Sequence, residues 1–201
     1  MVKHSIKTSD ARPIGQRLWT RYSAEENNVI EEQITNMLKC GVIERTNSPW
    51  ASNVVLVKKK DGKIMFCTDF RKLNEVTIFD TYPLPRITDV IDSLSGSGYF
   101  SCLDLISGCW QIEMCSEDGS DLKTAFITRD GIFKYKRMPF GVKNGPQEFQ
   151  RLMDHTFSDM RSELAYYMDD PLYIRSIIWA LQALFIIIDW KRLWLDYVPS
   201  I

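Results

Sequence analysis

The chain has 201 residues, of which 45% are hydrophobic and 25% are charged, and its formal net charge is −1. This length and composition are typical of an ordinary globular protein with one sizeable core, or with one core and a small satellite. The near-neutral charge excludes an argument for nucleic-acid binding from net charge, so any such affinity has to come from local clusters. Basic residues gather at 58–63, 71–72 and 134–143.

The cysteines and histidines argue against zinc and against secretion. The five cysteines form no CxxC pair, and the chain has only two histidines, so we expect no zinc site. An odd cysteine count without a secretory N-terminus predicts free thiols in an intracellular protein, cytoplasmic or nuclear. The most apolar stretch, 177–188, has about twelve residues where a membrane span needs roughly twenty. It predicts a core helix and no membrane partner.

The first half of the chain predicts a lead-in, a helix and a hairpin. Residues 1–22 show no periodicity and predict an extended segment. Ser23 and Glu26 form a capping box that begins a helix, and Gly41 is a suitable end for it. The apolar residues of this helix recur at helical spacing and are Ile30, Ile34, Met37 and Leu38. Residues 53–70 then predict two strands around an Asp61-Gly62 turn.

The second half predicts two helices among short strands. Residues 84–94 predict an amphipathic helix ended by Gly96, with one face formed by Ile87, Val90, Ile91 and Leu94. Residues 145–157 predict a helix that begins at Pro146 and turns inward Phe149, Leu152, Met153 and Phe157. Strand-like runs occupy 99–105, 110–114, 122–128, 132–137, 164–168 and 172–176. Because strands and helices do not alternate regularly, we expect the α+β class.

Three aspartates stand beside these predicted strands. Asp169 and Asp170 interrupt an apolar run, and Asp104 ends another one 65 residues earlier (169 − 104). Charge in such runs is costly unless it is paired or liganded. If the two strands are neighbours in one sheet, the carboxylates converge at its rim, where a pair of Mg²⁺ ions about 4 Å apart would let them stay ionised. Alternatively, the Asp pair makes a turn by bonding its own backbone, and Asp104 is a helix cap or a loop residue.

Several long motifs carry a resemblance to a known family. They are "SPWASNVVLVKKKDGK", "CTDFRKLNEVTIFDTYPLPRITDVIDSLSG", "LDLISGCWQI", "KTAFITRDGIFKYKRMPFGVKNGPQEFQRLM" and "YMDD". In this order, from about His4 to Ser176, they resemble the reverse transcriptases of Gypsy-type long-terminal-repeat retrotransposons. The resemblance implies the fingers and palm of a right-hand polymerase, with an antiparallel palm sheet packed on helices. It also implies a catalytic triad of Asp104, Asp169 and Asp170 that binds two Mg²⁺ ions, with Mn²⁺ as a substitute.

The resemblance assigns domains and partners as well. Residues 1–22 would be a lead-in, 23–98 the fingers with the start of the palm, and 99–176 the palm with the catalytic motifs and an inserted fingers hairpin. Residues 177–201 form a divergent apolar tail, and we interpret the chain as truncated before the thumb. The expected partners are an RNA or DNA template with its primer, a dNTP, and the thumb and RNase H portions of the polyprotein.

Individual residues receive roles from the same motifs. The nucleotide-binding residues would be Lys59, Cys109, Phe140 and Gly141. The residues that contact template or primer would be Arg71, Gln147, Tyr167 and Met168. Without the family, Lys59 is a solvated hairpin tip and "MPFG" is only a turn.

Among the positions that depart from the family pattern, three matter most. Met65 replaces an arginine that grips the triphosphate, Cys109 replaces an aromatic ring that blocks a ribose 2′-hydroxyl, and Pro171 follows the Asp pair directly. The leading hypothesis is therefore an RNA-directed DNA polymerase fragment that is weak or inactive alone. The alternatives are a catalytically dead nucleic-acid-binding fragment and a palm-like nucleotidyl cyclase, against which "PFG" and the fingers hairpin argue.

Overall fold

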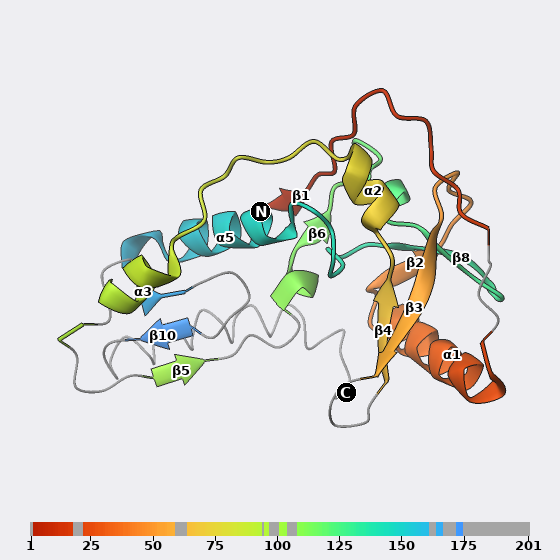
Figure 1. The fold of residues 1–201 in the computed structure, drawn as a ribbon, viewed down its shortest axis with the longest axis horizontal. Helices are drawn as coiled ribbons and strands as arrows, with labels where there is room; N and C mark the ends of the chain where they lie inside the picture. The colour runs from red at the N-terminus through yellow and green to blue at the C-terminus, as the bar shows by residue number, and fades with distance from the viewer. Residues whose placement is uncertain are drawn as a thin grey trace. The chain divides into compact units, whose positions relative to one another are not determined.

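The structure, a computed structural model, describes residues 2–17, 22–58, 64–93, 95–96, 101–103, 108–160, 164–166 and 172–174. The chain forms two compact units (Figure 1). The first unit comprises Met1–Phe79 and Cys109–Gly145, and the second comprises Asp80–Gly108 and Pro146–Ile201. Each unit joins two separate stretches of the chain, so each depends on contacts between residues far apart in sequence.

The first unit contains a five-stranded sheet with the order β2-β8-β7-β3-β4. Its strands are β2 (Ile43–Arg45), β3 (Ser52–Lys58), β4 (Ile64–Thr68), β7 (Phe126–Thr128) and β8 (Gly131–Tyr135). Strands β3 and β4 are antiparallel, with Val54 opposite Thr68 and Lys58 opposite Ile64. The two strands predicted within 53–70 are confirmed, and their Asp61-Gly62 turn lies outside the described residues.

Aromatic side chains fill the core of this sheet. Phe126 and Phe133 face each other across β7 and β8, with ring centroids 5.8 Å apart, and neither is exposed to solvent. The Phe126 ring also lies 5.2 Å from Tyr135 and 5.6 Å from Phe66. Alternating residues of a strand share one face, so these rings gather on one side of the sheet.

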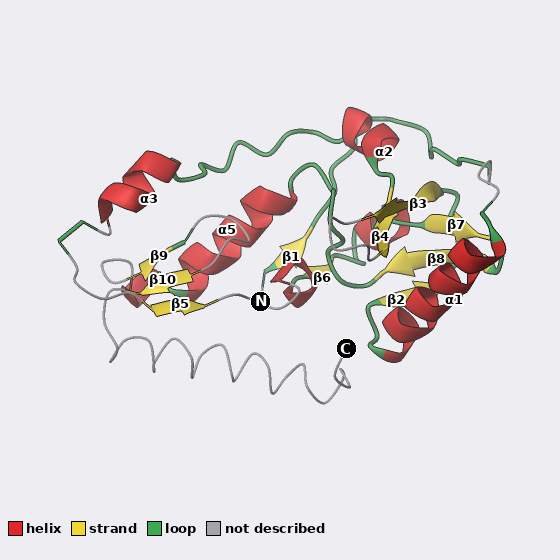
Figure 2. Cartoon of the chain, turned by 60° about the horizontal axis from the view of Figure 1, so that its bottom comes forward, coloured by secondary structure: helices red, strands yellow, loops and turns green. Residues whose placement is uncertain are grey.

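Helix α1 (Ala24–Lys39) packs against β2 and β4, as Figure 2 helps to follow. The predicted capping box is present, because the Glu26 N–H donates to the Ser23 hydroxyl oxygen (3.2 Å) and the Ser23 N–H donates to the Glu26 carboxylate (2.8 Å). Of the apolar residues at helical spacing, Ile30, Ile34 and Met37 are buried, whereas Leu38 lies at the margin of the apolar stripe and is 37% exposed.

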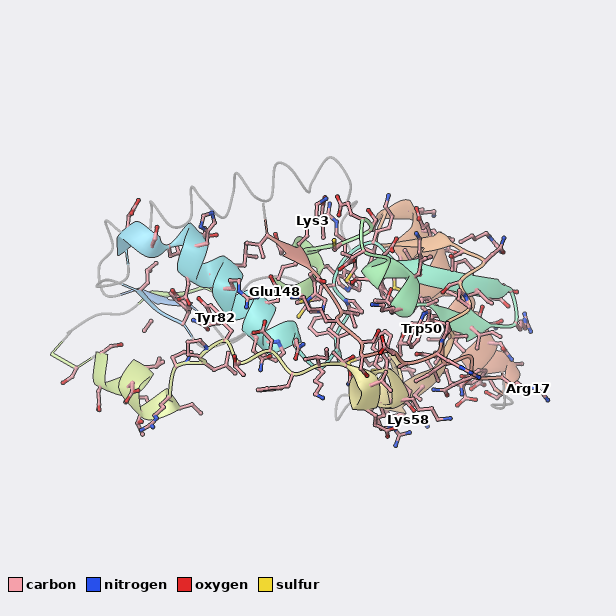
Figure 3. All side chains as sticks on the ribbon, turned by 90° about the horizontal axis from the view of Figure 1, so that it is seen from above. Lys3, Arg17, Trp50, Lys58, Tyr82 and Glu148 are labelled. Carbon is pink, nitrogen blue, oxygen red and sulfur yellow. The ribbon has the colours of Figure 1, made fainter. Side chains whose placement is uncertain are left out.

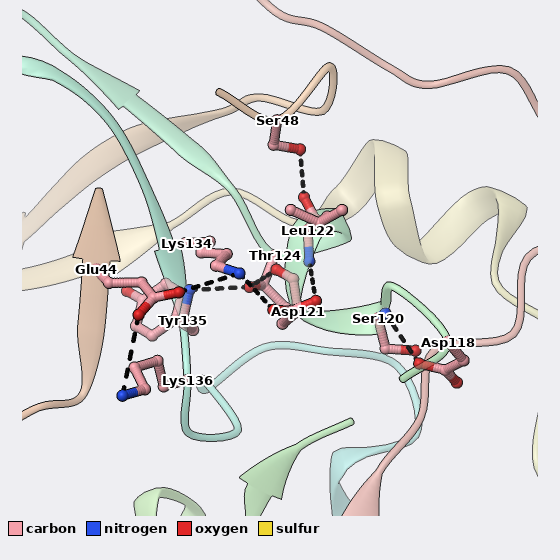
Figure 4. Close-up of polar contacts among 10 residues, drawn as sticks. All are labelled: Glu44, Ser48, Asp118, Ser120, Asp121, Leu122, Thr124, Lys134, Tyr135 and Lys136. Carbon is pink, nitrogen blue, oxygen red and sulfur yellow. Dashed lines mark hydrogen bonds and ion pairs between the residues drawn. The ribbon is translucent and has the colours of Figure 1, made fainter. Parts of the chain in front are cut away.

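A polar cluster fastens helix α4 (Ser120–Lys123) to the sheet (Figure 4). The Lys134 ammonium lies 2.5 Å from the Asp121 carboxylate and 3.1 Å from Glu44. Burial alone would lower the pKa of Lys134, but the hydrogen bonds to these two carboxylates raise it above its usual value. Lys136 lies 3.9 Å from Glu44. The positive charges of Lys134 and Lys136 are therefore compensated by carboxylates of the same unit. These two residues add little positive charge to a surface that could bind nucleic acid.

Strand β1 (Lys3–His4) pairs in parallel with β6 (Glu113–Met114), and a hydrogen bond also connects the residues that follow the two strands. Close by, the Asp118 carboxylate accepts hydrogen bonds from the Ser5 hydroxyl and from the Ser120 N–H. Burial by itself would raise the pKa of Asp118, but these hydrogen bonds outweigh it and lower the pKa to about 2.

This carboxylate predicts a pH-dependent contribution to stability. Because its pKa is lower in the folded chain than the usual value of about 3.9, its contribution is complete above about pH 4 and disappears as the pH falls towards 2. We expect Ser5→Ala to lower the free energy of unfolding more at pH 6 than at pH 3, as measured by urea denaturation. An equal loss at the two pH values would contradict this explanation.

The second unit contains an antiparallel sheet with the order β5-β10-β9. Its elements are β5 (Ser101–Leu103), β9 (Leu164–Ala165), β10 (Leu172–Ile174), α3 (Ile87–Ser93) and α5 (Gly145–Thr156), the last beginning at the final residue of the first unit. The predicted inward residues of α5 are confirmed, because Phe149, Leu152, Met153 and Phe157 are all buried. Helix α3 is also present, but its apolar face is open, with Ile87 56% and Ile91 61% exposed.

Several elements differ from the sequence-based expectations. Residues 108–111 form a 3₁₀ helix before β6, although 110–114 was predicted as one strand. Part of the strand predicted at 122–128 belongs to α4, which follows a left-handed Gly119 (φ 68°). Helix α2 (Arg71–Val76) was not expected. Short apolar runs have no periodicity that separates strand from helix, so neighbouring contacts decide. No helix in the described ranges has the length and hydrophobicity that crossing a membrane requires.

Candidate active site

Two strands of the second unit lie next to the predicted carboxylates in the sequence. Strand β5 ends at Leu103, directly before Asp104 in the sequence, and β10 begins at Leu172, two residues after Asp170. In the antiparallel register, Leu103 and Leu172 are direct partners. The end of β5 and the start of β10 therefore lie at the same edge of one sheet, which is the condition that convergence of the carboxylates requires.

The triad and three further predicted site residues lie outside the described part of the chain. They are Asp104, Asp169, Asp170, Lys59, Tyr167 and Met168. Their assignments stay predictions, and what the structure describes is the pairing of β5 and β10, the strands that lie next to the aspartates in the sequence.

A tight turn in the first unit carries two of the predicted nucleotide-binding residues. Phe140 is 52% exposed, and Gly141 has a φ of 86°, a left-handed conformation that side chains rarely tolerate. The Asn74 amide donates to the Gly141 carbonyl (2.8 Å), and its oxygen accepts from the Lys143 N–H (2.9 Å). Asn74 thus fixes both sides of this turn from α2. Sequence reasoning missed it, because an asparagine within a polar helix carries no signal of a distant partner.

Arg71, predicted to contact template or primer, is engaged by a neighbouring carboxylate. Its guanidinium donates two hydrogen bonds to Asp69, of 2.8 and 2.7 Å, while 85% of its side chain is exposed. The side-chain hydrogen bonds from Arg71 hold the pKa of Asp69 below its usual value. Exposed ion pairs of this kind are weak, so Asp69 orients the guanidinium without removing it from solvent.

The remaining predicted residues are distributed over both units. Cys109 is half-buried in the 3₁₀ helix Gly108–Gln111. Met65, at the position of the missing arginine, lies on β4 opposite Val57 and is 41% exposed. Gln147, another predicted template or primer contact, lies near the start of α5 in the second unit and is 6% exposed.

The chemistry of the predicted triad suits a magnesium pair. Three carboxylates supply hard, anionic oxygen donors, which Mg²⁺ prefers over nitrogen or sulfur. Among the residues with described placement, no three Asp, Glu, His or Cys side chains come together as ligands. The residue types of the predicted triad therefore fit the ion, and the metal site itself stays a prediction.

Solved structures show the same fold. The chain is similar to the protease-reverse transcriptase of prototype foamy virus, with a TM-score of 0.79 and 24% identity over 92% of this chain and 25% of that one. A foamy viral protease-reverse transcriptase in complex with double-stranded DNA gives a TM-score of 0.81 at 22% identity, covering 94% of this chain and 40% of that chain. The expected α+β class is confirmed, and the fold is that of the fingers and palm of a right-hand polymerase.

Sequence relatives define the family more closely. The Pol polyprotein from transposon 297 of Drosophila melanogaster is 38% identical over 175 residues, which is 84% of this chain and 16% of the relative. The Pol polyprotein from transposon gypsy of the same fly is 32% identical over 178 residues, or 85% of this chain and 17% of the relative. The enzymatic polyprotein of Cauliflower mosaic virus (strain CM-1841) is 33% identical over 175 residues, or 85% and 26%.

Residues 57–189 match the family described as "Reverse transcriptase (RNA-dependent DNA polymerase)". The chain belongs to this reverse transcriptase family, and the resemblance to retrotransposon Pol polyproteins is confirmed. It spans only about a sixth to a quarter of the length of the three curated relatives described above.

Proposed function

We propose that this chain supplies the fingers and palm of an RNA-directed DNA polymerase, which extends a primer by template-directed addition of dNTPs. Residues 23–98 contribute the fingers with the start of the palm, and residues 99–176 contribute the palm with the catalytic motifs and an inserted fingers hairpin. The observation that carries the proposal is the pairing of Leu103 with Leu172, which brings the sequence neighbours of Asp104 and Asp170 to one edge of a sheet. Foamy viral relatives of this fold have been solved with an RNA/DNA hybrid and with double-stranded DNA, which supports nucleic acid as the partner.

In this proposal the three aspartates hold a pair of Mg²⁺ ions, or Mn²⁺ in their place. Asp104, Asp169 and Asp170 would hold these ions, Asp170 more weakly than the other two. When bound, the ions would supply the Lewis acidity that lowers the pKa of a primer 3′-hydroxyl and stabilises a pyrophosphate leaving group. Lys59 offers a point charge to the incoming triphosphate. Phe140 and Gly141 contact the nascent base pair.

The remaining protein groups hold the nucleic acid. Arg71 neutralises a backbone phosphate, while Gln147, Tyr167 and Met168 contact template and primer. Such phosphate contacts position the duplex and make its binding depend on salt concentration.

Extension of an oligo(dT) primer on poly(rA) with dTTP tests the proposal. We expect product with Mg²⁺ or Mn²⁺ and none from Asp104→Asn. A chain that does not extend the primer under either metal would overturn the proposal, and duplex binding without extension would favour the second candidate below.

A second candidate is a nucleic-acid-binding fragment without turnover. Met65 favours it, because methionine lacks the charge and donors of the arginine that the family places there. Losing such charge-assisted hydrogen bonds costs about 1.5–3 kcal/mol, or roughly ten- to a hundredfold in nucleotide affinity. This candidate predicts duplex binding that weakens with salt and no extension product, even in Mn²⁺.

Cys109 leads to a prediction about sugar selectivity. A cysteine leaves space where the family has an aromatic ring, so the chain should reject ribonucleotides poorly. We expect Cys109→Tyr to raise the preference for dTTP over UTP by roughly tenfold, measured as the ratio of the kcat/KM values for incorporation. Equal ratios for the variant and the natural chain would contradict this role.

A further inference from the structure

A buried tyrosine precedes the predicted catalytic motif. Tyr166 follows β9 directly and is itself followed by Tyr167, Met168 and the Asp169-Asp170 pair. It is only 8% exposed, and its ring lies 6.3 Å from the ring of Phe157 at the end of α5. Its hydroxyl donates a 2.8 Å hydrogen bond to the Asp154 carboxylate, which α5 presents. Tyr166 is thus held both by the packing of its ring and by the hydrogen bond of its hydroxyl.

Both oxygens of Asp154 accept hydrogen bonds. The Tyr82 hydroxyl donates to Oδ2 at 2.6 Å, and the Gln150 amide donates to Oδ1 at 3.3 Å, beside the bond from Tyr166. Hydrogen bonds to an ionised carboxylate are shorter and stronger than neutral ones. With donors on each oxygen, the carboxylate cannot rotate without breaking one of them, so it presents a fixed acceptor to Tyr166.

A second set of contacts holds Tyr82 in place. The Arg151 guanidinium lies over the Tyr82 ring, 4.5 Å from its centroid, and it also pairs with Asp80 at 2.7 Å and with Glu148 at 2.5 Å. Figure 3 labels Tyr82 and Glu148, the residues that Arg151 joins within the second unit. Successive turns of α5 therefore anchor two segments that are remote in the sequence, residues 80–82 and the end of β9.

Resting on the proposed function, we propose that Asp154 is a positioning residue that holds Tyr166, and with it the strand leading into Asp169 and Asp170, on helix α5. Among the described residues, β9 pairs with β10 through Leu164 with Ile174 and Ala165 with Tyr173, and both pairs precede Tyr166. The hydroxyl–carboxylate bond at Tyr166 adds the anchor on the side where the catalytic aspartates follow.

Loss of this anchor is expected to change the positions of the catalytic carboxylates rather than the binding of dTTP or duplex. A metal pair needs its carboxylates close to their productive positions, and supports behind such ligands typically contribute about ten- to a hundredfold to activity. Losing the anchor should therefore lower kcat and leave the KM for dTTP and the duplex affinity nearly unchanged. A residue that merely stabilises the fold would not produce this split.

Two matched variants test the proposal. Tyr166→Phe and Tyr82→Phe each remove one hydroxyl that bonds to Asp154, but only the first precedes the catalytic motif. We expect Tyr166→Phe to reduce kcat for primer extension about ten- to a hundredfold, and Tyr82→Phe to reduce it less than about threefold, with similar melting temperatures. Equal losses of kcat in the two variants would overturn the positioning role.

A readout without activity separates this inference from the proposed function. In hydrogen–deuterium exchange, peptides covering residues 164–174 should exchange at least about threefold faster in Tyr166→Phe and in Asp154→Asn, and not in Tyr82→Phe, because local opening sets amide protection. Unchanged exchange in both of the first two variants would refute the anchor, whether or not the chain polymerises. Faster exchange in a chain without polymerase activity would support the anchor and count against the proposed function.

Discussion

Replacing Asp169 with asparagine is expected to reduce primer extension at least about a thousandfold, which corresponds to about 4 kcal/mol of lost transition-state stabilisation. The amide keeps the size of the side chain but removes the negative charge with which, in our proposal, Asp169 would hold the Mg²⁺ ions. Replacing Asp170, which binds the ions more weakly in our proposal, with asparagine should reduce primer extension less, by about ten- to a hundredfold. The measurement is the initial rate of dTTP incorporation on poly(rA) with oligo(dT).

Two controls make this result specific. Duplex affinity, measured by fluorescence anisotropy without metal, should be nearly the same in both asparagine variants and in the natural chain. An Asp159→Asn variant changes a carboxylate that lies in a 3₁₀ helix, Ser158–Met160, of the same unit, and it should retain full activity. Comparable activity of Asp169→Asn and the natural chain would remove the two-metal assignment.

Replacing Phe126 with alanine should destabilise the first unit by about 3–5 kcal/mol, the usual cost of deleting a large buried ring. Phe126 has no exposed surface and contacts the rings of Phe133, Tyr135 and Phe66, so its loss leaves a cavity that all three would line. Since a domain is stable by only about 5–15 kcal/mol, the variant should unfold at a clearly lower urea concentration or fail to accumulate.

The matched control for this variant is Phe79→Ala. Phe79 belongs to the same unit, yet 58% of it is exposed, so its replacement should change the free energy of unfolding by less than about 0.5 kcal/mol. Urea titrations followed by tryptophan fluorescence compare the two variants directly. Equal destabilisation by Phe79→Ala and Phe126→Ala would contradict the assignment of the aromatic cluster as the core.

Local sequence patterns predicted the elements whose signals lie within a few residues. The capping box at Ser23 and Glu26 marked the start of α1, and the helical spacing of Phe149, Leu152, Met153 and Phe157 identified the buried face of α5. Patterns failed where the run was short. Residues 110–114 and 122–128 contain strand formers, but a 3₁₀ helix and α4 occupy part of them, because tertiary contacts override a weak strand propensity.

The sequence by itself determined the family, because motifs in a fixed order need no coordinates to be compared, and it named the aspartates to which our proposal assigns the chemistry. Only the tertiary structure decided that β5 and β10 are partners, with Leu103 opposite Leu172, and that Asp154 receives the hydroxyls of both Tyr82 and Tyr166. Tyr82 lies 72 residues from Asp154. Hydrogen bonds and strand pairs between such remote residues follow from how the whole chain packs, and they leave no mark on the local pattern of either residue.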